Sequence, residues 1–164
     1  MIEIRNATKK DLEDIQKLNF QLFEKEYKEY DKTLNLKWAF GEEGTNYFKK
    51  RINDNENSFA MVAVIDKKIV GYFVGAIHKP EFYRNINNFA EGENMFVLKG
   101  YRNKGIGTKL INKFISWCKK KNVKTIKVVA SVQNKKAIEL YRKLGFNDYN
   151  LTLENEPNNF IVGN

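Results

Sequence analysis

The most informative segment of the sequence is residues 97–108, Val97-Leu98-Lys99-Gly100-Tyr101-Arg102-Asn103-Lys104-Gly105-Ile106-Gly107-Thr108. It connects an apolar segment typical of a strand to an apolar stripe with helical spacing. The first turn of a helix carries N–H groups without acceptors and the positive end of the helix dipole. Gly105 and Gly107 let an anion approach that backbone, and Arg102 and Lys104 add positive charge. The stretch therefore predicts a binding site for a pyrophosphate group.

Two common phosphate-binding motifs do not fit this loop. A P-loop requires Gly-x-x-x-x-Gly-Lys-Ser/Thr, and that spacing is absent. A dinucleotide-binding fingerprint requires a third glycine where this chain has Leu110. The pattern present is Arg-x-x-Gly-x-Gly, which resembles the coenzyme A loop of the GNAT acetyltransferases.

A second block, residues 133–146, strengthens this resemblance. It reads Gln133-Asn134-Lys135-Lys136-Ala137-Ile138-Glu139-Leu140-Tyr141-Arg142-Lys143-Leu144-Gly145-Phe146. It is similar to the family's Asn-x-x-Ala-x-x-x-Tyr-x-x-x-Gly-Phe pattern, and two helical turns place Asn134 and Tyr141 on one face. The resemblance covers residues 59–150 well, whereas residues 1–58 match only in layout.

The resemblance implies a donor and roles for named residues. The donor is acetyl-CoA, with the hydroxyl of Tyr141 near the thioester sulfur as general acid and Asn134 beside the pantetheine arm. The main chain of Phe96 and Val97 pairs with that arm like an added strand, and Met95 also lines it. The pyrophosphate is held at the glycine loop, mainly by backbone amides, and the group consists of Arg102, Asn103, Lys104, Gly105, Ile106, Gly107 and Thr108.

The sequence offers three candidates for the side chain that accepts the proton of the substrate amine. Glu93 is the first choice, because members resembling diamine acetyltransferases carry a glutamate at its position, four residues before Val97, where it works through water. Glu91 is the second choice, since a regular strand would place it on the same face. His78 is the single histidine of the chain and could also serve.

The remaining pattern predicts an α/β fold as a single domain, residues 1–164, with a mixed, mostly antiparallel central sheet flanked by helices. Residues 2–5 alternate like a strand, and helical spacing follows from Leu12. A second helical stretch covers about 34–52 and is expected to be broken or kinked near residues 41–44. The two strands 59–65 and 69–77 flank a tight turn. Strands are then expected at 89–98 and 125–130, helices at 105–120 and 134–144, and closing strands at 146–153 and 159–162.

The net charge of +9 is unevenly distributed. Residues 99–143 carry 14 basic residues and one acid, Glu139, whereas the rest carries 15 basic and 19 acidic residues. A local positive field around the glycine loop suits a compact polyanion better than nucleic acid. The sequence also lacks an apolar run of the about 18 residues that a membrane span needs. It has no signal-peptide pattern, and its one cysteine, Cys118, excludes an internal disulfide, so a cytoplasmic protein is expected.

The acceptor is less well defined than the donor. The N-terminal helices are locally acidic, which would attract a cationic amine, although interleaved lysines weaken that argument. The acidic residues are Glu24, Glu26, Glu29, Asp31, Glu42 and Glu43. The favoured function is acetylation of a small primary amine, such as a polyamine, an amino acid or an aminoglycoside. The alternatives are acetylation of a protein N-terminus or lysine, and a non-catalytic module that binds coenzyme A or nucleic acid. No cluster has zinc-ligand spacing, and a homodimer is expected from the resemblance alone.

Overall fold

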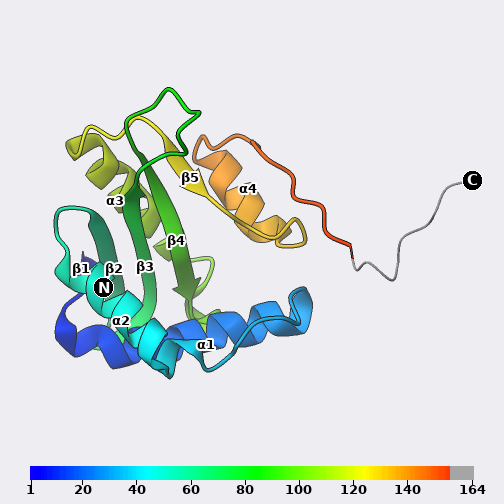
Figure 1. Ribbon diagram of the computed structural model, residues 1–164. Helices are drawn as coiled ribbons and strands as arrows, with labels where there is room; N and C mark the ends of the chain where they lie inside the picture. Colours follow the sequence, from blue (N-terminus) through cyan, green and yellow to red (C-terminus); the bar gives the residue numbers. More distant parts are fainter. Residues whose placement is uncertain (156–164) are drawn as a thin grey trace, which may run out of the picture.

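A five-stranded sheet forms the centre of the computed structural model, which describes residues 1–155 (Figure 1). Its strands are β1 (Glu3–Asn6), β2 (Ser58–Ile65), β3 (Lys68–His78), β4 (Phe89–Val97) and β5 (Ile126–Val128). They lie in the order β1-β2-β3-β4-β5, the first four antiparallel to their neighbours and β5 parallel to β4. The predicted mixed, mostly antiparallel sheet is therefore confirmed.

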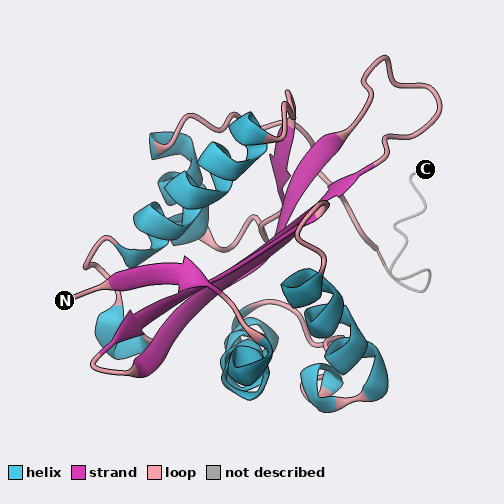
Figure 2. Cartoon of the chain, turned by 90° about the vertical axis from the view of Figure 1, so that its left-hand side faces the viewer, coloured by secondary structure: helices cyan, strands magenta, loops and turns pink. Residues whose placement is uncertain are grey.

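Helices cover both faces of this sheet (Figure 2). One face is covered by α1 (Leu12–Glu29) and α2 (Glu42–Asn53), which contact β2, β3 and β4, and the other by α3 (Ile106–Lys120). The fourth helix, α4 (Lys135–Lys143), has no buried residue and lies beside β5 in Figure 1. Three short 3-10 turns complete the set: η1 (Lys9–Asp11), η2 (Trp38–Phe40) and η3 (Lys99–Tyr101).

The core has two parts, one on each face of the sheet. Under α3, the aromatic rings of Phe59, Phe73 and Phe114 pack with centroid separations of 5.0–5.7 Å. Cys118 is fully buried on this face, and burial raises the pKa of its thiol to about 12, so it is an unreactive core residue. Under α1 and α2, the core combines residues such as Ile15 and Phe48 with buried polar groups.

The second predicted helix and the predicted closing strand have different outcomes. The break expected near residues 41–44 is confirmed: the helical stretch is divided into η2 and α2, because Gly41 is extended (φ −71°, ψ 173°) and a new helix begins at Glu42. The closing strand expected at 146–153 is wrong, since those residues form no strand. β5 has only three residues and offers little edge for pairing, while Asp148 and Tyr149 bind Arg142 and Arg84 instead. The strand expected at 159–162 lies outside the described residues.

Within residues 1–155, no helix is both long and apolar enough to cross a membrane.

Candidate active site

The strands β4 and β5 separate halfway along β4. They pair only where residues 90–92 face residues 126–128, and Figure 1 shows them diverging beyond that point. A β-bulge lies at the divergence: Gly92 pairs with Gly75 and Asn94 with Val74, so Glu93 is the extra residue. A bulge turns the strand locally and redirects side chains. From Glu93 onward, β4 therefore has an edge that β5 does not cover.

The glycine loop leads from the end of β4 into α3. Asn103 (φ 62°) and Gly105 (φ 75°) adopt left-handed conformations, and Gly105 precedes the helix without a side-chain cap. The backbone amides of residues 103–108 have no hydrogen-bond acceptor among residues 1–155. Consecutive unpaired amides at a helix N-terminus form a concave site for an anion.

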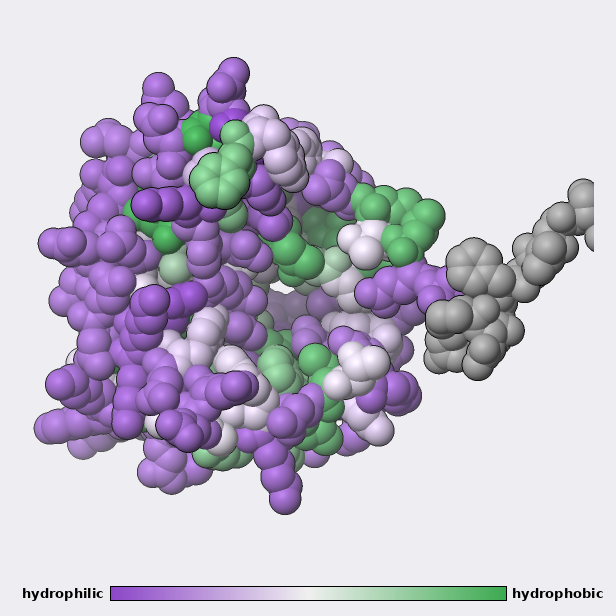
Figure 3. Space-filling view, in the orientation of Figure 1, coloured by the Kyte–Doolittle hydropathy of each residue, from purple (hydrophilic) through white to green (hydrophobic). Residues whose placement is uncertain are grey.

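Three elements meet at the start of α3. A Cβ atom built on Gly107 would lie 3.3 Å from Leu140 Cδ2 of α4 and 4.0 Å from Met95 Cε of β4. The glycine loop, the open edge of β4 and the helix that carries Tyr141 therefore border one region. In the same orientation as Figure 1, Figure 3 shows the surface hollowed between the parts over α4 and α1.

The basic side chains of the loop are partly engaged within the protein. Arg102 Nε donates to the carbonyl oxygen of Val97 at 2.8 Å, and its guanidinium lies 5.1 Å from the ring centroid of Phe96. Lys104 Nζ lies 5.4 Å from the centroid of Tyr101. The charge of Arg102 thus stays at the mouth of the loop, where it also fixes the end of β4.

The predicted residues of α4 are held in distinct ways. Asn134 caps the helix, with Oδ1 accepting from the Ala137 amide at 3.3 Å. Tyr141 packs edge-on against Phe146 at 5.5 Å, and its hydroxyl has no hydrogen-bond partner within residues 1–155. Burial raises the pKa of Tyr141 to about 12, so the phenol stays protonated at neutral pH. Gly145 (φ 91°) ends the helix in the left-handed conformation that the sequence predicted.

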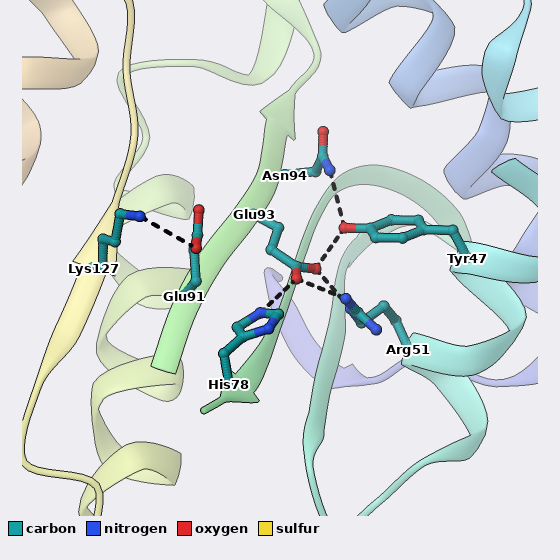
Figure 4. A network of polar contacts seen from close by, with 7 residues as sticks. All are labelled: Tyr47, Arg51, His78, Glu91, Glu93, Asn94 and Lys127. Carbon is teal, nitrogen blue, oxygen red and sulfur yellow. Dashed lines mark hydrogen bonds and ion pairs between the residues drawn. The ribbon is translucent and has the colours of Figure 1, made fainter. Parts of the chain in front are cut away.

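Glu93 lies at the centre of a cluster of polar side chains, shown in Figure 4. Its Oε2 accepts from the Tyr47 hydroxyl and from Arg51 Nε, both at 2.6 Å. Its Oε1 accepts from an Arg51 Nη at 2.6 Å and lies 3.0 Å from His78 Nε2. Burial raises the pKa of Glu93, but the hydrogen bonds from Arg51, Tyr47 and His78 and the charge of Arg51 together lower it by more, so the pKa lies below its ordinary value.

The cluster continues inward as a buried chain of hydrogen bonds. Asn94 Nδ2 donates to the Tyr47 hydroxyl at 3.1 Å, and Asn19 Nδ2 lies 3.0 Å from the Tyr72 hydroxyl and 3.4 Å from Asn94 Oδ1. Asn19 Oδ1 is buried without a partner in residues 1–155. Burial raises the pKa values of Tyr47 and Tyr72, so both phenols are neutral. The Tyr47 hydroxyl donates to Glu93, and the Tyr72 hydroxyl accepts from Asn19. These hydrogen bonds link Asn19 of α1 to Glu93 of β4 by way of Asn94 and Tyr47.

The three candidate proton acceptors have different surroundings. His78 belongs to the Glu93 cluster, whereas Glu91 turns toward β5 and lies 3.8 Å from Lys127 (Figure 4). Three members of the cluster, Tyr47, Arg51 and Asn94, were not predicted as site residues from the sequence. Tyr47 and Arg51 are four residues apart on one helix face, which is the signal that could have revealed them.

A groove near the start of α2 lies next to this cluster. It is lined by residues from η2 and the first turn of α2: Asn35, Lys37, Trp38, Phe40, Gly41, Glu42 and Glu43. The ring of Trp38 lies 5.2 Å from that of Tyr47, which in turn binds Glu93. Glu42 and Glu43 give this groove two negative charges, against one positive charge from Lys37. Among the predicted acids of α1, Glu29 is instead paired with Lys25 at 2.6 Å.

Residues 1–155 contain no group of three or more histidine, cysteine or carboxylate side chains that could hold a metal ion.

Comparison with known proteins finds one family model, described as the acetyltransferase (GNAT) family, which matches residues 12–146. An uncharacterized N-acetyltransferase, MJ1207 of Methanocaldococcus jannaschii, is 36% identical over 88% of this chain, and the match spans 60% of its own length. An N-alpha-acetyltransferase of Sulfurisphaera tokodaii is 28% identical over 88% of this chain and 80% of its own. The solved aminoglycoside N-acetyltransferase AAC(6')-Iy, in complex with CoA, shares the fold with a TM-score of 0.74 and 18% identity, covering 95% of this chain and 94% of that one.

Proposed function

This chain belongs to the acetyltransferase (GNAT) family, and from that membership we propose that it transfers an acetyl group from acetyl-CoA to the primary amine of a small molecule. One observation carries the proposal. The unpaired amides of residues 103–108 begin a helix beside the uncovered edge of β4, with Leu140 of α4 packed against the same helix. A diphosphate at the amides and an extended arm along β4 would bring the thioester toward α4.

The chemistry requires a free amine, a stabilised oxyanion and an acid for the leaving thiolate. We assign the acid to Tyr141, whose phenol is protonated at neutral pH because burial raises its pKa to about 12. The Glu93 cluster receives the amine, since it lies on β4 at the point where the strand becomes uncovered. Attack of the amine forms the C–N bond, the C–S bond breaks, and the proton of Tyr141 goes to the sulfur.

The surroundings of Glu93 support a small acceptor. Its side chain is only 14% exposed and is enclosed by Tyr47, Arg51 and His78. A primary amine on a slender chain can reach such a site, whereas a folded protein surface cannot. The nearby Glu42 and Glu43 would attract a cation before it enters.

A second candidate acceptor is a protein N-terminus, favoured by the relative named N-alpha-acetyltransferase. An extended peptide would lie along the groove at η2 and the start of α2. The two candidates differ in the length of chain that must be bound, so one assay separates them.

The test is release of free thiol from acetyl-CoA in the presence of pooled amines, and separately of pooled peptides. We expect turnover with amines such as polyamines, amino acids or aminoglycosides. Turnover with peptides alone would favour the second candidate. No release with either pool, together with no binding of coenzyme A at low salt, would exclude the proposed function.

The role of Tyr141 has its own test. Tyr141→Phe should lower kcat roughly 10²–10⁴-fold, because the acid for the leaving thiolate is lost. The matched control is Tyr149→Phe, which alters an exposed tyrosine of the C-terminal segment and should leave kcat unchanged. Near-normal turnover of Tyr141→Phe in a steady-state assay would reject the assignment.

A further inference from the structure

We infer that His78, and not Glu93, accepts the proton of the substrate ammonium group, and that Glu93 is the residue that positions His78. The inference rests on the proposed function and concerns the same site. It departs from the expectation, implied by family resemblance, that the glutamate at this position is itself the base.

The first step is that Glu93 is already committed to other partners. Both of its oxygens accept from Arg51 in a two-point ion pair at 2.6 Å, and Oε2 also accepts from Tyr47. The side chains of Arg51 and Glu93 are 10% and 14% exposed, so water can replace little of this pairing. A proton on Glu93 would remove one half of a buried ion pair, which is unfavourable. Glu93 is therefore a poor proton acceptor, and its fixed position suits it to orient His78.

The second step is that His78 has the arrangement that a base requires. It is the last residue of β3, stacked on Phe89 with ring centroids 5.5 Å apart, and its side chain is 36% exposed. Its Nε2 lies 3.0 Å from Glu93 Oε1. Because an ionised carboxylate only accepts, Nε2 must carry a hydrogen, which leaves the lone pair of the neutral ring on Nδ1. Glu93 thus selects the tautomer and stabilises the imidazolium that forms, as carboxylates do beside catalytic histidines.

The charged groups around His78 agree with this assignment. On β4 it faces Glu93, whose charge is balanced by Arg51 of α2, and on α2 it is near the neutral phenol of Tyr47. Lys127 of β5 lies 5.6 Å from the centroid of Phe89 and 3.8 Å from Glu91, so its charge is directed to a different carboxylate. Lys79, the next residue in the chain, is exposed.

The proton transfer can be written completely. The substrate ammonium gives one proton to Nδ1 of His78, which becomes imidazolium while its Nε2–H keeps the hydrogen bond to Glu93. The freed amine then attacks the thioester carbonyl and forms the C–N bond. As the tetrahedral intermediate collapses, the C–S bond breaks, the thiolate takes the proton of Tyr141, and the second proton of the nitrogen restores the Tyr141 phenol. The one proton left on His78 passes to solvent after product release.

The experiment compares His78→Gln, Glu93→Gln and Lys79→Gln in the full chain, by following kcat/KM for the best amine against pH. His78→Gln should lose roughly 10²–10⁴-fold at neutral pH and recover as the pH approaches the pKa of the amine, since free amine then needs no base. Its KM for acetyl-CoA should be unchanged. Glu93→Gln should lose less than His78→Gln, and Lys79→Gln should match the wild type.

Two results would overturn the inference. One is a His78→Gln enzyme that keeps more than about a tenth of wild-type turnover while Glu93→Gln loses far more, which would make Glu93 the base. The other is a loss in His78→Gln that does not recover at high pH, which would indicate a merely structural role. His78→Asn, checked by circular dichroism, repeats the test if His78→Gln does not fold. Failure of the proposed function is distinguishable, because the wild type itself would then release no thiol.

Discussion

The two faces of the central sheet are built on different principles. The face under α3 holds buried apolar side chains, dominated by Phe59, Phe73 and Phe114, which contact one another without any polar partner. The face under α1 and α2 combines an apolar core with a chain of hydrogen bonds from Asn19 to Glu93. Apolar packing tolerates small shifts, whereas a buried polar group without its partner is costly.

The difference separates the side chains that mainly stabilise the fold from those that carry the proposed chemistry. The α3 face stabilises the sheet and holds the glycine loop at the N-terminus of α3. The α1/α2 face fixes the direction of the Glu93 and His78 side chains through bonds of defined geometry. The bulge at Glu93 lets two residues that are adjacent in sequence, Glu93 and Asn94, both bind Tyr47 of α2, whereas a regular strand would direct them to opposite faces. Three variants test this division.

The largest expected effect is on the α3 face. Phe114→Ala removes a fully buried ring that packs between Phe59 and Phe73, and should lower the free energy of unfolding by about 3–5 kcal/mol. The measurement is urea denaturation followed by fluorescence. Phe82→Ala, at an exposed aromatic, is the control and should change stability by less than about 0.5 kcal/mol. If the folded fraction of Phe114→Ala lost its activity tenfold, the division between the faces would not hold.

The next effect is on the α1/α2 face. Arg51→Met leaves the Glu93 carboxylate buried without its cation and should cost about 3 kcal/mol, of which the double variant Arg51→Met/Glu93→Gln should regain about 1–2 kcal/mol. The control is Arg142→Met, whose pair with Asp148 is exposed to solvent and should contribute little to stability. A double variant no more stable than Arg51→Met would show that the pair is not coupled.

The same variant has a defined pH dependence. The pKa of Glu93 is lowered in the folded protein, so its pairing stabilises the fold above the unfolded pKa of about 4.3 and is lost as the pH falls through the folded value. The difference in stability between the wild type and Arg51→Met should therefore shrink as the pH drops below about 4. A difference that stays constant with pH would assign the loss to packing alone.

The smallest effect concerns the close contact between β3 and β4 beside the bulge. A Cβ atom on Gly75 would lie 2.4 Å from the Glu91 carbonyl oxygen and 3.1 Å from Phe114 Cε2. Gly75→Ala should therefore cost about 1–3 kcal/mol and displace β4 at the bulge. Gly100→Ala has no atom within 4 Å of the added Cβ and is the matched control. Equal stability of the two variants in thermal unfolding would mean that β3 and β4 are not closely apposed there.

Much of the fold could be predicted from the sequence because its signals are local. The strands 58–65 and 68–78, the helix 106–120 and the cap at Gly145 follow from side-chain periodicity and from glycine, each within a few residues of its prediction. The predicted closing strand at 146–153 failed for the opposite reason. Tyr149, Leu151 and Leu153 alternate like a strand, but a strand also requires an edge to pair with, and a pattern within one segment cannot report that edge.

The same distinction between local signals and long-range contacts applies to the candidate site. The glycine loop was visible in the sequence because a helix N-terminus binds anions through the amides of consecutive residues, so neighbours in the chain are also neighbours in space. The Glu93 cluster was not visible as a whole, since Tyr47 lies 46 residues and His78 15 residues from Glu93. The anion site thus stays a prediction from the sequence, which also indicated the order of the elements from the first strand to the helix that carries Tyr141. Only the tertiary structure decided which groups surround the carboxylate, because side-chain hydrogen bonds between α2, β3 and β4 exist only once the sheet has brought these elements together.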